Sequence, residues 1–181
     1  MLTLRHSVVG LALALFASSF PPAYAADSGG GSSGDQPVCR AGYVYNKQKQ
    51  ICEPQQSGVL PDGDLAEYAY LLAKNERYDE ALAVLDLMAD PDTPIALNYR
   101  GYATRKLGKV DEGISFYLQS VALDPQYPHV REYLGEAYIA KGDIDLARQQ
   151  LAAIESLCGT TCEYYLELAE EIAAAEKPAQ Q

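Results

Sequence analysis

The region from residue 62 to residue 157 places its apolar residues at the spacing of one face of an α-helix. Ala137 and Tyr138, for example, follow Leu134 by three and four residues, so all three share one side of a helix. Breaks in the pattern fall at Gly108-Lys109 and Gly142-Asp143, where the chain can turn between two helices. We therefore predict six amphipathic helices, over residues 62–75, 78–89, 94–107, 110–123, 128–141 and 144–157.

The same arrangement of small and apolar residues recurs along this region. Gly101 and Gly135 lie 34 residues apart, and each is followed twelve residues later by another small residue, Gly113 or Ala147. A third copy lies upstream, with the same mutual spacings between Leu65, Ala69, Ala81 and Leu85. A period of this size indicates stacked helical hairpins, none of which can bury its apolar face alone.

The two complete copies resemble the tetratricopeptide repeat family. Gly101, Ala103 and Pro125 stand where this family has its small residues and its closing proline. Two residues depart from the pattern: Gly113 replaces an alanine, and Arg131 replaces a large apolar residue. In the third copy the matching residues are Gly135, Tyr138 and Ala147. The resemblance implies an all-α, TPR-like helical-hairpin solenoid with three repeats, at about 62–93, 94–127 and 128–158, that binds a peptide or protein.

Two smaller elements flank the repeats. Within residues 37–54, the segment Tyr43–Tyr45 followed by a turn at Asn46–Lys49 predicts a small two-stranded hairpin. After the repeats, Thr160 and Glu163 have the spacing of a helix capping box, and we predict a capping helix from Cys162 to about Ala175, within residues 160–176. Its apolar face should consist of Leu166, Ala169, Ile172 and Ala173, and its wet face of Glu163, Glu167, Glu170 and Glu171.

The first 25 residues have the pattern of a secretory signal peptide. Arg5 and His6 precede the apolar stretch Val8–Phe16, and Ala23-Tyr24-Ala25 is a small-x-small cleavage site. The apolar stretch is shorter than the roughly 20 residues that span a bilayer. We therefore expect cleavage after Ala25, a flexible Gly/Ser linker over residues 26–36, and a periplasmic protein that does not insert into the membrane.

The composition narrows the classes of ligand. The chain has 14 Lys and Arg against 25 Asp and Glu, a net charge of −11, and loss of residues 1–25 would make it −12. Binding to nucleic acid or to an anionic membrane surface needs a basic patch, so we expect neither. We also expect no cofactor, because the sequence contains no P-loop and no dinucleotide-binding fingerprint.

All four cysteines follow the predicted cleavage site. An even number in an oxidising compartment favours disulfide bonds, and four cysteines permit three pairings. We expect Cys39–Cys52 and Cys158–Cys162, because each pair is close in sequence. The second pair could instead be redox-active, since Cys162 would lie in the first turn of a helix, or could bind a metal. Its C-x-x-x-C spacing differs from the C-x-x-C of oxidoreductases and favours a structural bond.

Candidate catalytic residues are few. After the predicted cleavage site the chain has one histidine, His129, at the start of a helix, where a surface position is expected. No nucleophile motif accompanies it, and the acidic residues do not cluster in the sequence. We predict that the protein is not an enzyme.

The resemblance also implies a working surface, the concave face lined by the first helix of each hairpin. Tyrosine and arginine suit peptide recognition there, because they combine contact area with hydrogen-bond donors. Lys74, Arg105 and Lys106 would make one end positive, and Glu132 and Glu136 would make the other negative. The alternative is that these residues form ordinary solvated helix faces. The full predicted groove comprises Tyr70, Lys74, Asn98, Tyr102, Arg105, Lys106, His129, Glu132 and Glu136.

Three functions are compatible with this sequence. The leading hypothesis is a non-enzymatic adaptor or scaffold that binds a protein or peptide in the cell envelope through the concave face. A second is a cell-wall or glycan-binding module that uses the Cys39–Cys52 loop. A third is a thiol-redox accessory factor for envelope protein maturation that uses Cys158 and Cys162. The sequence specifies neither the partner nor the oligomeric state.

Overall fold

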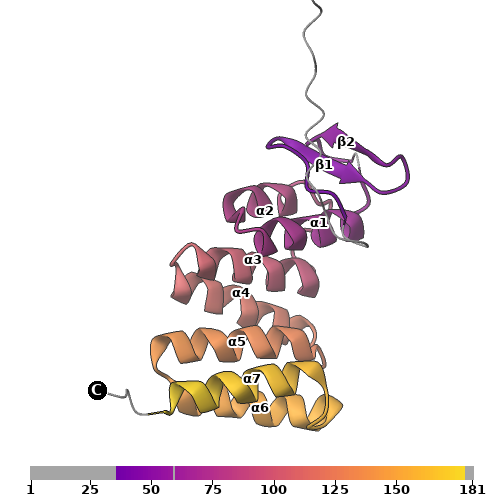
Figure 1. Ribbon diagram of the computed structural model, residues 1–181. Coiled ribbons are helices and arrows are strands. Elements are labelled where there is room, and N and C mark those ends of the chain that lie inside the picture. Colours follow the sequence, from indigo (N-terminus) through magenta and orange to yellow (C-terminus); the bar gives the residue numbers. More distant parts are fainter. Residues whose placement is uncertain (1–35, 59, 178–181) are drawn as a thin grey trace, which may run out of the picture. The chain divides into compact units, whose positions relative to one another are not determined.

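The structure is a computed structural model, and it describes residues 36–58 and 60–177 of the 181-residue chain (Figure 1). The predicted signal peptide and the linker up to residue 35 lie outside the described residues. Two short strands come first, β1 (Tyr43–Asn46) and β2 (Ile51–Pro54). The helices that follow are α1 (Asp62–Lys74), α2 (Tyr78–Leu85), α3 (Pro94–Lys106), α4 (Val110–Leu123), α5 (Pro128–Lys141), α6 (Ile144–Cys158) and α7 (Glu163–Ala175).

The helices pack as successive hairpins, which confirms the predicted TPR-like solenoid. Helices α1 and α2, α3 and α4, and α5 and α6 form the three hairpins, and each hairpin contacts the next. The first helices of the hairpins also contact one another, α1 with α3 and α3 with α5, and α7 continues this row by packing on α5 (Figure 1). One side of the array is therefore built from α1, α3, α5 and α7.

Local sequence signals position the helix ends. Thr93 caps α3, with its hydroxyl accepting a hydrogen bond from the backbone N–H of Ala96 at 3.3 Å, and Pro94 occupies the first turn. Pro128 begins α5 in the same way, and Gly142 ends α5 in the left-handed conformation, with φ of 82°. Because these signals are local, α5 has the bounds that the sequence predicts, and the bounds of α4 also agree with the prediction.

Helix α2 is shorter than predicted, because a tertiary contact ends it. The predicted helix runs to residue 89, whereas α2 ends at Leu85. The carboxylate of Asp62, in the first turn of α1, accepts hydrogen bonds from the backbone N–H groups of Ala89 at 2.8 Å and Asp90 at 2.9 Å. These bonds hold the chain in a turn at positions where a helix would continue.

Close helix approaches explain the small residues of the repeat. A Cβ atom at Gly101 would lie 2.6 Å from the ring of Tyr117 on α4, and one at Gly113 would lie 2.9 Å from the backbone oxygen of Gly101. The second distance accounts for the glycine at position 113, since an alanine there would push α3 and α4 apart. At Gly135 a Cβ atom would meet Leu168 of α7 at 2.5 Å, so this glycine makes room for the last helix.

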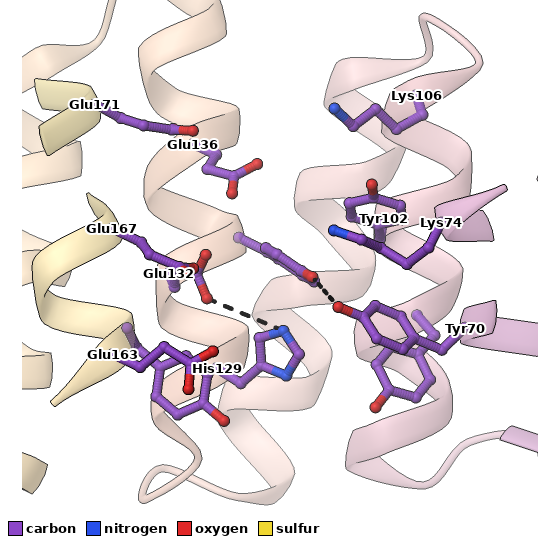
Figure 2. Close-up of a pocket in the computed structure, with 13 residues that line it drawn as sticks. Tyr70, Lys74, Tyr102, Lys106, His129, Glu132, Glu136, Glu163, Glu167 and Glu171 are labelled. Atoms are coloured by element: carbon purple, nitrogen blue, oxygen red, sulfur yellow. Dashed lines mark hydrogen bonds and ion pairs between the residues drawn. The ribbon is translucent and has the colours of Figure 1, made fainter. Parts of the chain in front are cut away.

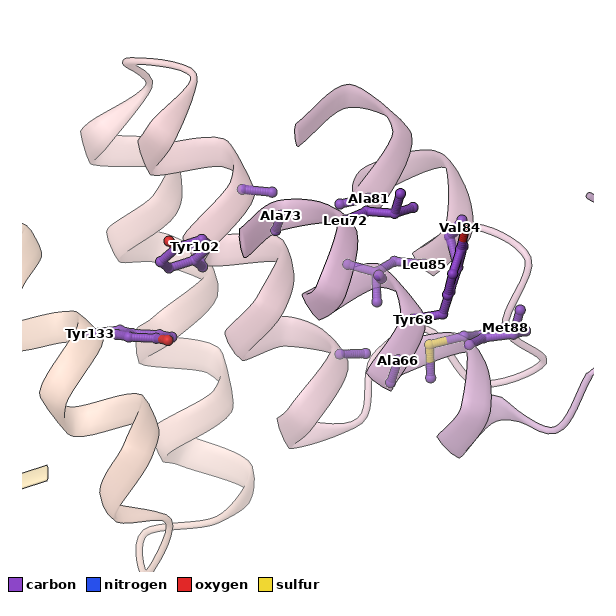
Figure 3. Packing of buried hydrophobic residues seen from close by; sticks show 14 of the residues in the cluster. Ala66, Tyr68, Leu72, Ala73, Ala81, Val84, Leu85, Met88, Tyr102 and Tyr133 are labelled. Carbon is purple, nitrogen blue, oxygen red and sulfur yellow. The ribbon is translucent and has the colours of Figure 1, made fainter. Parts of the chain in front are cut away.

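The N-terminal hairpin is part of the main hydrophobic core. Its strands pair antiparallel, and the predicted disulfide bond joins Cys39 to Cys52. Val44 is fully buried in the same cluster as the residues of α1 and α2, part of which Figure 3 shows around Tyr68 and Leu85. The backbone N–H of Cys39 donates to the Tyr68 hydroxyl at 2.7 Å, and Arg77 donates to the Cys39 carbonyl oxygen at 2.7 Å. The hairpin thus closes the first end of the array.

The C-terminal helix differs from its prediction in two respects. Helix α7 begins at Glu163 after Cys162, whose side chain makes no capping hydrogen bond, so the predicted capping box is wrong. Its buried residues are Leu168 and Ile172, whereas Leu166, predicted to be buried, is 54% exposed. The rotation of the helix is set by Leu168, which fills the space above Gly135. The predicted bond between Cys158 and Cys162 is present before this helix.

None of the helices in residues 36–58 and 60–177 has the length and apolar character needed to cross a bilayer.

Candidate binding groove

A cavity of about 570 Å³ opens on the side of the array formed by α1, α3, α5 and α7 (Figure 2). We call this cavity the groove. Its lining combines aromatic rings with side chains of both charges. Glutamates from α5 and α7 face lysines from α1 and α3 across it (Figure 2). The groove is therefore a polar cavity with an aromatic floor and two oppositely charged walls.

An aromatic cluster centred on His129 forms the floor. The ring of Tyr164 stacks on the imidazole with centroids 5.0 Å apart, and the ring of Tyr133 lies 4.4 Å from it. Tyr70 stacks on Tyr99 at 4.5 Å, and its hydroxyl is hydrogen-bonded to that of Tyr133 at 2.9 Å. These contacts join α1, α3, α5 and α7 through side chains at a single level of the array, so the floor has a fixed shape.

His129 is enclosed, which differs from the surface position expected from the sequence. Its side chain is 14% exposed, and tyrosines surround the ring. Burial lowers the pKa of this imidazole to about 4, with nearby Lys74 adding to the effect and Glu167 opposing it. His129 is therefore neutral at pH 7 and contributes an aromatic surface.

Basic residues gather around Tyr102 on the other wall. The ammonium groups of Lys74 and Lys106 lie 5.7 and 5.5 Å from the centre of its ring, within the range of a cation–π contact. Both lysine side chains line the groove. Burial raises the pKa of Tyr102 to about 12, so its hydroxyl stays protonated and can donate a hydrogen bond into the groove.

Glutamates from α5 and α7 form the acidic wall. Glu132 and Glu136 belong to α5, and Glu163, Glu167 and Glu171 belong to α7. Burial and the neighbouring carboxylates raise the pKa of Glu132 to about 9, so this carboxyl group holds a proton at neutral pH. Burial also raises the pKa of Glu171, and Glu136 adds to that effect.

The structure brings seven of the nine predicted groove residues together and places two elsewhere. Asn98 is completely buried and donates to the Tyr127 hydroxyl at 3.2 Å. Arg105 does not line the groove; its side chain is largely buried, donates to the Tyr117 hydroxyl at 3.3 Å and forms an ion pair with Glu136. The seven residues that line the groove are Tyr70, Lys74, Tyr102, Lys106, His129, Glu132 and Glu136.

Six residues that line the groove were not predicted from the sequence. Tyr99 and Tyr133 follow the predicted groove residues Asn98 and Glu132 by one position, and neither was predicted to line the groove. The other four come from α7, which the sequence analysis treated only as a cap. Its glutamates recur at intervals of four residues, and this stripe on one helix face is a signal that could have found them. The six residues are Tyr99, Tyr133, Glu163, Tyr164, Glu167 and Glu171.

Comparison with known sequences supports the repeat assignment. Residues 105–156 match the sequence model of the tetratricopeptide repeat family. The TPR repeat-containing thioredoxin TTL4 of Arabidopsis thaliana is 28% identical to this chain over 83 residues, which are 45% of this chain and 12% of that protein. The similarity therefore spans only a small part of the plant protein.

Comparison with solved structures identifies the same fold. The first TPR of Spaghetti (RPAP3), bound to the HSP90 peptide SRMEEVD, has a TM-score of 0.54 and 23% identity, over 67% of this chain and 98% of that one. The type III secretion chaperone SycD of Yersinia enterocolitica, in complex with a peptide of the translocator YopD, has a TM-score of 0.54 and 18% identity, over 66% and 97% of the two chains. With the hairpin packing described above, these matches show that the chain has the tetratricopeptide repeat fold.

Proposed function

We propose that the protein is a non-enzymatic adaptor that binds a segment of another protein in the groove. The observation that carries this proposal is the groove itself, a cavity of about 570 Å³ that exposes tyrosine, lysine and glutamate side chains from four helices. Such a surface offers aromatic contact area for affinity and charges of both signs for selecting a partner of complementary charge.

The solved relatives support this proposal. The Spaghetti domain holds an HSP90 peptide, and SycD holds a peptide of YopD. Each covers about two thirds of this chain with the same helical arrangement. At 23% and 18% identity these similarities extend to the fold and not to the partner. The chemistry of the partner of this chain is therefore inferred from the residues of its own groove.

A peptide-display selection tests the proposal. Random peptides would be selected on the purified chain, and the affinity of each enriched peptide measured by calorimetry for the wild type and for a Tyr70→Ala variant. Tyr70 lines the groove and contacts the rings of Tyr99 and Tyr102. We expect Tyr70→Ala to weaken binding by roughly tenfold or more, as expected for a central aromatic contact.

The matched control is Leu118→Ala, which truncates a side chain of α4 that is 47% exposed and lies outside the groove. This variant should bind the selected peptides like the wild type. Failure to select any peptide, or peptides that lose affinity with Leu118→Ala and keep it with Tyr70→Ala, would contradict groove binding.

We further propose that the adaptor is exported and works in the periplasm. The support is the sequence pattern of residues 1–25 together with two disulfide bonds, which persist in oxidising compartments. N-terminal sequencing of the protein from fractionated bacterial cells tests this. A periplasmic form beginning at Ala26 is expected, and an unprocessed cytosolic form would contradict export.

A further inference from the structure

The groove has a strongly acidic wall that the protein itself leaves largely unneutralised. Five glutamates line it, against two lysines that lie on the opposite wall. Within the described residues, Glu136 is the member of this group that pairs with an arginine, the largely buried Arg105. Concentrating carboxylates around a cavity destabilises the free protein, since like charges repel and burial removes water. A bound cation would relieve both effects.

Glu132 is the most buried carboxyl group of this wall. It is 3% exposed, and its carboxyl group points into the groove (Figure 2). Its carboxyl group is hydrogen-bonded to those of Glu167 and Glu136, so three carboxyl groups lie together here. Nε2 of His129 lies 4.0 Å from Oε2 of Glu132, beyond hydrogen-bond distance. Neighbouring carboxyl groups in a buried site disfavour a second negative charge, and a bound cation would remove that repulsion.

Aromatic rings stand beside this carboxyl group in positions that suit an organic cation. Tyr133 and the stacked pair of His129 and Tyr164 border the same part of the cavity. Ring faces attract ammonium and guanidinium groups, and they also pack against the alkyl stem of a lysine or arginine side chain. Within residues 36–58 and 60–177, no group of three or more His, Cys, Asp or Glu side chains is arranged to hold a metal ion. The lining therefore favours an organic cation.

We propose that the wall formed by α5 and α7 binds a lysine or arginine side chain of an extended peptide segment, with its cationic head at Glu132 and Glu167. This inference rests on the proposed function and specifies the chemistry of the partner. Lys74 and Lys106, on the opposite wall, would repel the cation and so direct it to the glutamates. The alkyl stem of the bound lysine or arginine side chain would lie along the rings of His129 and Tyr164.

Binding of this cation should be coupled to release of a proton. Glu132, which holds a proton at neutral pH, would become a carboxylate when a cation replaces that proton. The affinity should therefore rise with pH between about 6 and 9, by up to tenfold per unit. The charged and titratable groups around Glu132 come from three helices: His129, Tyr133 and Glu136 of α5, Glu163, Tyr164 and Glu167 of α7, and Lys74 of α1.

The test uses the groove-dependent peptides selected on the full chain, as defined by loss of binding in Tyr70→Ala. We expect these peptides to share a lysine or arginine. Replacement of that residue by norleucine, which keeps the stem and removes the charge, should weaken binding at least tenfold in calorimetry at pH 8. Glu167→Gln should weaken binding of the unmodified peptide by roughly tenfold, as expected for loss of a charge-assisted hydrogen bond.

The control variant is Glu155→Gln, an identical change at an exposed residue of α6 that lies outside the groove. It should bind like the wild type. Glu132→Gln should abolish the pH dependence of binding, provided that its circular dichroism spectrum and unfolding transition match those of the wild type. If Glu132→Gln does not fold, the pH dependence in Glu167→Gln, which also removes one of the facing carboxylates, should be reduced instead.

The outcomes separate this inference from the proposed function. If no groove-dependent peptide is selected, both fail. Groove-dependent peptides without a shared basic residue, or a norleucine replacement that changes affinity less than threefold, overturn the cation site alone. The compound n-butylammonium is a probe of the lysine head and stem. If it binds as tightly as the peptide, the cation site of a peptide segment is also overturned, because the site would then be one for a free amine.

Discussion

The two ends of the repeat array are closed in different ways. One end should affect only the stability of the protein, whereas the other should affect both its stability and its ligand binding. At the first end, the β1–β2 hairpin places Val44 in the core and connects Cys39 to Tyr68 and Arg77 through backbone hydrogen bonds. At the other end, α7 packs through Leu168 and Ile172, and its ion pair with α6, between Arg148 and Glu176, is exposed. Helix α7 also supplies four residues of the groove, whereas the hairpin supplies none.

A solenoid needs both ends covered, because each repeat leaves an apolar face open to the next. The hairpin meets only this need. Helix α7 also forms one wall of the groove, so every perturbation of its packing should alter ligand binding as well. Damage to the first end should lower stability and leave the affinity of the folded protein unchanged. The predictions below test this separation.

Truncation of Leu168 should have the largest effect. Leu168 is fully buried against Gly135, and Leu168→Ala would leave a cavity between α5 and α7. We expect a loss of about 2–5 kcal/mol in the free energy of unfolding, measured by urea denaturation. The remaining folded protein should bind its peptide more weakly, since the position of Glu167 depends on this packing.

Leu166→Ala is the matched control for that experiment, because it changes the same residue type in the same helix. Leu166 is 54% exposed, so the expected change is within about 0.5 kcal/mol. Equal losses for the two variants would show that α7 packs on the face that the sequence pattern suggested.

Removal of the disulfide bonds should affect the two ends unequally. The Cys39–Cys52 bond spans 13 positions and the Cys158–Cys162 bond spans 4. The chain-entropy relation gives about 3 kcal/mol for the longer loop and about 2 kcal/mol for the shorter. Double alanine variants of each pair, compared by urea denaturation, measure the difference.

Peptide affinity gives a second comparison between the two disulfide variants. The Cys158/Cys162 double variant should bind more weakly, because the bond fixes the start of α7 beside Glu163. The Cys39/Cys52 variant, assayed where it is folded, should bind like the wild type. Reduced affinity in the Cys39/Cys52 variant alone would contradict the division of roles.

A single hydroxyl group tests the attachment of the hairpin. Tyr68→Phe would leave the backbone N–H of Cys39 buried without its acceptor, at a cost of roughly 1–3 kcal/mol. Tyr165→Phe, which removes a hydroxyl from a half-buried ring of α7, should cost less than about 0.5 kcal/mol. A Tyr68→Phe protein as stable as Tyr165→Phe would mean that the hairpin is held by apolar contacts alone.

The sequence predicted those features that short segments determine. The apolar period and the prolines place helix boundaries, and α4 and α5 begin and end at the predicted residues. The spacing of Gly101 and Gly135 led to the correct fold, because close helix approach demands a small residue wherever it recurs. The disulfide pairs followed from sequence proximity.

Features that depend on contacts between distant segments could not be predicted from the sequence. The end of α2 is set by the side chain of Asp62, 27 residues before the amide that it binds. The rotation of α7 is set by the packing of Leu168 against Gly135, and an amphipathic pattern with many alanines does not specify it. Asn98 and Arg105 have a groove-facing spacing, yet neighbouring helices bury both in hydrogen-bond networks.

The pH dependence of the free energy of unfolding should also differ between titratable groups near the two ends, and this is the smallest of the expected effects. In the C-terminal half, Glu132 has a pKa of about 9 in the folded chain against about 4.5 when unfolded, so the folded state binds more protons between these values. Its contribution to stability is therefore present at low pH and is lost as pH rises. His129, with a pKa of about 4 against 6.5, acts in the opposite direction, and only below about pH 6.5. Between pH 7 and 8 the effect of Glu132 remains, with a loss of at most about 1.4 kcal/mol per unit.

Urea denaturation of the wild type at pH 7 and pH 8 should show this loss, and Glu132→Gln should remove it. Near the first end, the hydrogen bond from Arg77 lowers the pKa of Glu80, so its contribution is lost only as pH falls through the acidic range. Glu80→Gln should accordingly leave the difference between pH 7 and 8 unchanged. An unchanged difference in Glu132→Gln, or its disappearance in Glu80→Gln, would place the titrating group at the wrong end of the array and remove the basis for coupling proton release to binding in the groove.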